Sequence, residues 1–119
     1  MNHFEKLKSY LPKKQNLARI LAHELAHIIY LGFSDSKRSS YEKDADWIRL
    51  DVGDGKTIAI PTSTRTFVEQ DGEMSPDEDF ANNIEFFLFE PETLKKKSNA
   101  IYLWIQKSFG PDFKLVREK

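Results

Sequence analysis

The chain has 119 residues, of which 39% are hydrophobic and 31% charged, and its formal net charge is -1. A length in the range of about 100–150 residues predicts one domain that spans residues 1–119. The small net charge gives no electrostatic reason to expect a nucleic-acid partner. The absence of cysteine excludes disulfides, thiolate metal ligands and cysteine nucleophiles. Any metal site must therefore use histidine and carboxylate side chains.

The sequence also bears on localisation. No segment approaches the roughly 20 apolar residues of a membrane span. The N-terminal segment Met1–Lys14 contains Glu5 and four lysines, too many charges for the apolar part of a signal peptide. We therefore expect a cytoplasmic protein with no membrane partner, although secretion by a route without a signal peptide is compatible with these features.

Two helices are expected in the first third of the chain. A short helix is predicted at Asn2–Tyr10, before Leu11-Pro12. A longer helix is predicted at Lys13–Leu31, with Gly32 as its C-terminal cap, from the helical spacing of Leu17, Ile20, Leu21, Ile28 and Leu31. The polar segment Phe33–Ala45 is predicted to be a loop.

The rest of the chain predicts a hairpin followed by helices. Alternating residues in Trp47–Val52 and Lys56–Ile60, joined by Gly53-Asp54-Gly55, are typical of a β-hairpin. After an irregular segment, the capping box of Ser75-Pro76-Asp77-Glu78 predicts a helix that Pro91 ends. A last helix is expected at Asn99–Phe109. The predicted fold is mainly helical α+β with one small hairpin, in which Trp47 and Trp104 belong to the core.

The segment His23-Glu24-Leu25-Ala26-His27 lies within the long predicted helix. Residues i and i+4 of a helix are about 40° apart and one turn along the axis, so both imidazoles leave one face about 6 Å apart. This separation suits two ligands of one tetrahedral zinc ion. Glu24 is rotated by about 100° from His23, where its carboxylate can reach a water on the metal without ligating the metal. The alternative is that His23 and His27 lie on a partly exposed helix face, with Glu24 as a solvated acid.

A third protein ligand is expected from the capping-box helix. Glu78 is the leading candidate, because a second helix can bring its carboxylate onto the first. Asp79 and Asp77 are alternatives, as is the absence of a third ligand in this segment. Glu78 is also positioned to bond the backbone N–H of Ser75 in the capping box. The remaining histidine, His3, is a poor candidate because it lies near the chain terminus.

Together, these two motifs resemble the gluzincin metallopeptidases. The likeness is greatest to the group that contains the catalytic domain of anthrax lethal factor and the Pro-Pro endopeptidases. In that group a helical Glu followed closely by Phe-Ala is the third zinc ligand, which Glu78 and Phe80-Ala81 match. The stretch from Pro91 to Gly110 is similar to the closing helices of the family. The resemblance covers about residues 19–31 and 66–110, and it implies a minimal zincin-like domain that binds Zn²⁺ and acts on a peptide or protein substrate.

The sequence also departs from the family pattern. Asn82 stands where the family has an acid that orients a ligand histidine, and Asp71 stands where it often has an oxyanion-stabilising Tyr, so Tyr30 or Tyr41 would have to serve. The family has a substrate-holding sheet upstream of its metal-binding helix, whereas only 22 residues precede His23. The resemblance therefore implies that the predicted hairpin borders the substrate cleft or that this role is absent.

The leading hypothesis is a zinc metalloendopeptidase. His23, His27 and Glu78 would hold the metal, and Glu24 would act as general base. One alternative is a gluzincin protease that cleaves phage repressors, since some of these have Ala-Asn after the ligand Glu, as in Ala81-Asn82. Others are a zinc-binding interaction module without turnover and a metal-free helical domain. A protein partner could also contact the aromatic run at residues 86–89 if part of it is exposed.

Overall fold

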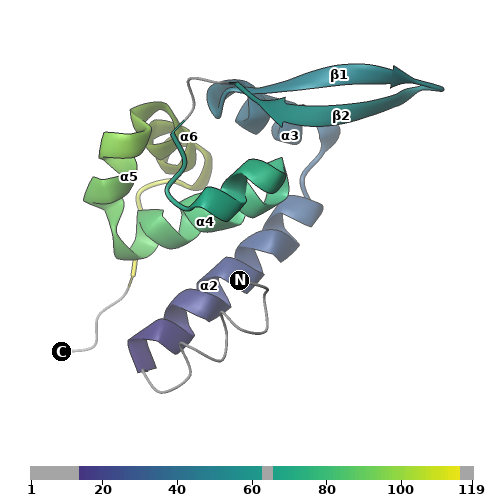
Figure 1. The fold of residues 1–119 in the computed structure, drawn as a ribbon. Coiled ribbons are helices and arrows are strands. Elements are labelled where there is room, and N and C mark those ends of the chain that lie inside the picture. Colours follow the sequence, from purple (N-terminus) through teal and green to yellow (C-terminus); the bar gives the residue numbers. More distant parts are fainter. Residues whose placement is uncertain (1–13, 63–65, 116–119) are drawn as a thin grey trace.

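The computed structural model describes residues 14–62 and 66–115, so the predicted helix Asn2–Tyr10 lies outside the described residues. Five α-helices, one 3₁₀ helix and one antiparallel hairpin are described (Figure 1): α2 (Lys14–Leu31), α3 (Asp35–Asp44), β1 (Trp47–Gly53), β2 (Lys56–Pro61), η1 (Gln70–Met74), α4 (Pro76–Phe89), α5 (Pro91–Lys97) and α6 (Asn99–Phe109). This is the expected mainly helical α+β fold with one hairpin.

Helix α2 confirms the long predicted helix, but most of the apolar residues that predicted it do not face the core. The backbone N–H of Gly32 closes the C-terminus by donating to the carbonyls of Ile28 and Ile29, at 3.2 and 3.1 Å. The buried face of α2 packs against α4 and contains Ile20, His23, Ala26 and Tyr30. The large apolar side chains on the outer face are 39–75% exposed: Leu17, Leu21, Leu25, Ile28 and Leu31.

The expected loop at Phe33–Ala45 is wrong, because α3 occupies most of it. Ser34 caps this helix by accepting a hydrogen bond from the backbone N–H of Lys37 at 3.1 Å. The segment has almost no apolar periodicity, and Tyr41 is its one large apolar residue in the core. The helix is therefore stabilised by its cap and by tertiary contacts, neither of which an apolar pattern reports.

The hairpin was predicted correctly. Its strands pair Ile48 with Ile60 and Leu50 with Ile58, and Asp54 and Gly55 form the turn with φ angles of 56° and 72°. Two successive positive φ angles are typical of the type I′ turn, whose twist matches that of the strands. The ribbon projects from the helical body (Figure 1), and the buried Trp47 anchors its base in the core.

The second half of the fold follows the predicted capping signals. The Ser75 hydroxyl accepts a hydrogen bond from the Glu78 backbone N–H at 3.1 Å and starts α4. Pro91 ends this helix and begins α5, and α6 has the predicted bounds. The segment expected to be irregular before Ser75 contains the short helix η1. In the aromatic run, Phe86 is buried and Phe87 packs against the core, so a partner that contacts this run stays a prediction.

Aromatic side chains dominate the core between α2, α3, α4 and α6. The Phe80 ring is fully buried and lies 5.1 Å from the ring of Tyr30, 5.2 Å from that of Tyr41 and 6.2 Å from that of Trp104, centroid to centroid. These tilted and edge-to-face pairs are the favoured geometries for aromatic rings. The packing joins the two helices of the histidine site to the rest of the domain. Both tryptophans are core residues, as expected.

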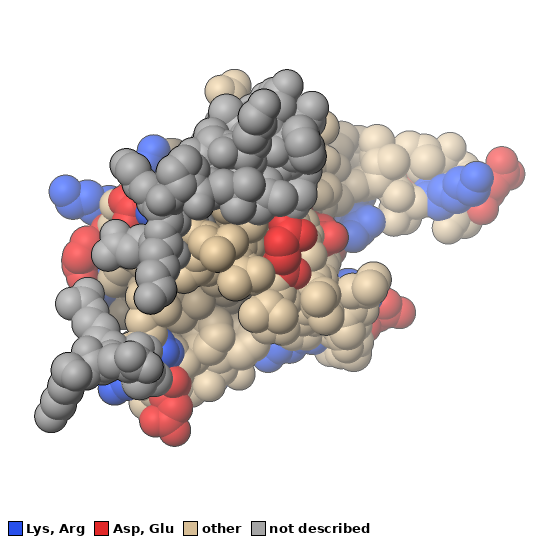
Figure 2. All heavy atoms as spheres, turned by 90° about the horizontal axis from the view of Figure 1, so that it is seen from below, with Lys and Arg blue, Asp and Glu red and all other residues tan. Residues whose placement is uncertain are grey.

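The surface of the described chain mixes charged and uncharged regions. On the face shown in Figure 2, the blue and red side chains of the described residues lie in small groups separated by tan residues, and one red group lies near the middle of the view. None of the described helices has the length and apolar character needed to cross a membrane.

Candidate metal centre

The site forms where α2 packs against α4. Arg19, His23 and His27 follow one another at intervals of four residues and share one face of α2. Glu78 and Glu85 are seven residues apart, almost two full turns, and so share one face of α4. The contact between the helices brings these basic and acidic groups together in pairs.

Donor atoms of three side chains meet at the centre of this contact. Nε2 of His23 lies 2.9 Å from one carboxylate oxygen of Glu78, and Nε2 of His27 lies 3.1 Å from the other. The two Nε2 atoms are 3.2 Å apart. Tetrahedral zinc with bonds of about 2.0–2.2 Å separates its ligand atoms by about 3.3–3.6 Å, which is a few tenths of an ångström longer than these distances. Among the described residues, His23, His27 and Glu78 form a group able to hold a metal ion.

Outer carboxylates face the other nitrogen of each imidazole. An oxygen of Asp77 lies 2.8 Å from Nδ1 of His27, which is a hydrogen-bond distance, whereas an oxygen of Glu85 makes an ion-pair contact with Nδ1 of His23 at 3.4 Å. A carboxylate favours the tautomer with its hydrogen on Nδ1, which leaves the lone pair on Nε2. The Nε2 lone pairs of His23 and His27 and the carboxylate of Glu78 then point toward one another. Because all three groups are hydrogen-bond acceptors, this arrangement is favourable only with a proton or a metal ion between them.

Without a metal, protons fill this role. The hydrogen bonds to Asp77 and then to Glu78 raise the pKa of His27 from 6.5 to about 10. The hydrogen bonds from His23 and His27 hold the pKa of Glu78 well below its usual value of 4.5. The metal-free cluster therefore carries its stabilising proton across neutral pH, and a metal ion must displace that proton in order to bind.

We expect the metal-free protein to lose stability as the pH rises above neutral. Because the pKa of His27 is raised by folding, its contribution is fully present below pH 6.5 and is lost as the pH rises through about 10. Urea unfolding midpoints of the chelator-treated protein between pH 6 and 10 measure this loss. The His27→Gln variant is the control, and an equal pH dependence in that variant would contradict the assignment.

The alternatives to Glu78 occupy different environments. The carboxylate of Asp79 is fully buried and accepts hydrogen bonds from the Tyr41 hydroxyl and the Trp47 indole N–H, both at 2.9 Å. Asp77 faces Nδ1 of His27, on the side of the ring away from the three donor atoms. The capping bond of Glu78 uses its backbone N–H, while its side chain lies with the histidines. Glu78 is therefore the acid that the structure brings to both Nε2 atoms.

Neither tyrosine considered for oxyanion stabilisation points its hydroxyl at the donor atoms. Tyr41 donates to Asp79, and the buried Tyr30 hydroxyl donates to Glu42 at 3.5 Å. Asp71 accepts a hydrogen bond at 2.7 Å from the side-chain amide of Asn82. The role of oxyanion stabiliser is thus unassigned among these residues.

Sequence reasoning missed Arg19 and Glu85. Their signal was present in the spacing, since Arg19 precedes His23 by four residues and Glu85 follows Glu78 by seven. Such spacing is common on charged helix faces. It therefore indicates an ion pair between Arg19 and Glu85 only when α2 and α4 are known to pack against each other.

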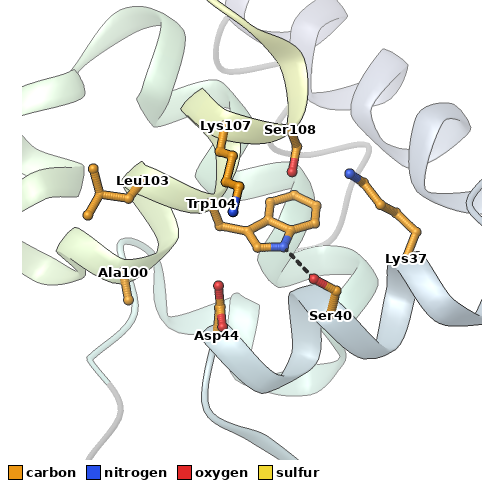
Figure 3. A pocket seen from close by; sticks show the side chains of 8 residues that line it. All are labelled: Lys37, Ser40, Asp44, Ala100, Leu103, Trp104, Lys107 and Ser108. Carbon is orange, nitrogen blue, oxygen red and sulfur yellow. Dashed lines mark hydrogen bonds between the residues drawn. The ribbon is translucent and has the colours of Figure 1, made fainter.

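A separate pocket of about 520 Å³ lies between α3 and α6 (Figure 3). The Trp104 indole N–H donates to the Ser40 hydroxyl at 3.0 Å, and the Lys37 ammonium lies 5.0 Å from the centre of the ring. The pocket is lined by Lys37, Ser40, Asp44, Ala100, Leu103, Trp104, Lys107 and Ser108. It contains no histidine and none of the three candidate ligands.

Comparisons with known proteins identify no relative. No protein-family model, no curated protein and no solved structure matches the chain. The functional argument therefore rests on the residues of the chain and on their geometry.

Proposed function

We propose that this protein is a zinc-dependent metallopeptidase whose metal ligands are His23, His27 and Glu78. The observation that carries the proposal is the convergence of two Nε2 atoms and one carboxylate at 2.9–3.2 Å, with a carboxylate facing Nδ1 of each ring. Two imidazoles and one carboxylate form a donor set typical of catalytic zinc sites, which keep a fourth position open for water or substrate.

The chemistry of the site divides between the metal and Glu24. Bound zinc would polarise the scissile carbonyl and lower the pKa of the attacking water. Glu24, one residue after His23 and partly buried, would accept the proton of that water and pass it to the departing amine nitrogen. The base is then a side chain of the same helix that holds both histidines, and the rigidity of the helix fixes their relative position.

The proposal requires one zinc ion per chain. Zinc titration of chelator-treated protein should saturate at one equivalent and release protons, because His27 must give up its proton to become a ligand. Affinity should therefore rise with pH, by up to about tenfold per unit for each proton displaced. Isothermal titration in buffers of different ionisation enthalpy measures the proton release.

The other histidine provides a matched control for this titration. His3→Gln should bind zinc like the wild type, whereas His23→Gln should not bind it tightly. If the wild-type protein binds no zinc, both the metal site and the peptidase proposal are wrong.

A zinc-binding module without turnover is the second candidate. It is favoured by the tyrosine hydroxyls, since those of Tyr30 and Tyr41 bond to Glu42 and Asp79 inside the core. Cleavage of an unfolded protein mixture by the zinc-loaded chain distinguishes the two functions, because the module would bind zinc and leave the mixture intact.

A further inference from the structure

The side chain of Glu85 joins a metal-ligand candidate to a second charged residue. It is only 3% exposed, and both of its oxygens have partners. One oxygen accepts a hydrogen bond from Nε of Arg19 at 2.8 Å and forms an ion pair with Nη2 at 2.7 Å, and the other oxygen lies 3.4 Å from Nδ1 of His23. The guanidinium of Arg19 is held in turn by Glu90 at 2.6 Å and lies over the ring of Phe86. Glu85 is thus fixed in place on the side away from the histidine.

The carboxylate that faces Nδ1 of His27 is more exposed to solvent than Glu85. Asp77 lies 2.8 Å from Nδ1 of His27, but its side chain is 48% exposed. The two histidines therefore each face a carboxylate, one buried and supported by an arginine and the other at the surface. Asn82, at the position where the gluzincin pattern has its orienting acid, is bonded to Asp71 instead.

We infer that Glu85 and Asp77 are the positioning residues of the metal site, and that Arg19 holds Glu85 for this task. The inference rests on the proposed metal site and adds which residues orient its ligands. Asp77 through its hydrogen bond and Glu85 through its negative charge favour the Nδ1–H tautomer of their imidazoles, which keeps the Nε2 lone pairs directed at the metal. A purely structural ion pair between Arg19 and Glu85 would stabilise the fold without this effect on the ligand.

Zinc affinity and the stability of the metal-free protein separate these two roles. Glu85→Gln keeps the shape of the side chain and removes its charge, and Asp77→Asn does the same at the surface. Each substitution should weaken zinc binding about 10–100-fold, the range typical of outer residues that orient metal ligands. Competition with a chromophoric chelator gives the affinities, and urea unfolding of the chelator-treated variants shows the folded fraction.

The matched control is Glu92→Gln, which removes an exposed carboxylate that pairs with Lys95 and leaves the ion pairs of Arg19 and Glu85 intact. It should bind zinc within about twofold of the wild type. Asn82→Asp should likewise fail to increase zinc affinity, because this position faces Asp71.

Two outcomes would overturn the inference in distinguishable ways. If wild-type protein binds one zinc and both Glu85→Gln and Asp77→Asn bind it equally well, the outer carboxylates do not position the ligands, while the metal site stands. If the wild type binds no zinc, both proposals fail. Asp77→Asn keeps the test valid even if the buried substitution at Glu85 prevents folding, because the Asp77 side chain is half exposed.

Discussion

The Glu24→Gln variant should retain zinc and its fold but lose peptide hydrolysis by about 10²–10⁴-fold, the range for removal of a general base. Glutamine has the size and hydrogen-bonding capacity of glutamate but cannot accept the proton of the attacking water. Glu24 is not part of the three-residue group, so the substitution leaves the metal donors unchanged. The loss should appear in kcat more than in KM, because proton transfer belongs to the transition state.

Hydrolysis is measured with a broad peptide library and zinc-loaded protein, with zinc content determined on the same samples. The exposed Glu73→Gln variant, in η1, is a control for removal of one acidic charge. A wild-type protein that carries full zinc and cleaves nothing in the library would exclude catalysis and leave the zinc-binding module.

Substitution of Glu78 should have the largest effect on metal binding among the three acids at the start of α4. Glu78→Ala removes the carboxylate that lies 2.9 and 3.1 Å from the two Nε2 atoms. Zinc affinity should fall by more than the roughly 10–100-fold expected for an outer residue, because a ligand itself is lost. Competition titration against a chelator of known affinity measures the difference.

The Asp79→Asn variant is the comparison, and we expect it to lower the stability of the fold without lowering zinc affinity. Its carboxylate accepts hydrogen bonds from Tyr41 and Trp47 inside the core, so the substitution should cost about 1–3 kcal/mol of stability. Zinc affinity of the folded variant should stay near that of the wild type. Loss of zinc from Asp79→Asn with retention in Glu78→Ala would show that Asp79, not Glu78, is the third ligand.

Local signals in the sequence were sufficient for most of the helices and the hairpin. The spacing of His23 and His27 places two imidazoles on one helix face wherever that helix lies. Ser75 and Pro91 mark the ends of α4 through capping and through the missing proline N–H. The turn at Asp54-Gly55 requires positive φ angles that these residues tolerate. Such effects act within a few residues, so the sequence alone determines them.

The tertiary structure alone decided which faces are buried and which acids meet the histidines. Leu17 and Leu21 helped to predict α2 and yet lie at the surface, because the packing against α4 selects the face that contains His23. Successive residues of a helix are about 100° apart, so Asp77, Glu78 and Asp79 point in three directions. The way α2 and α4 cross places Asp77 at Nδ1 of His27 and Glu78 at the two Nε2 atoms. It places Asp79 in the core. Burial over the whole domain sets that crossing, and no short stretch of sequence contains this information.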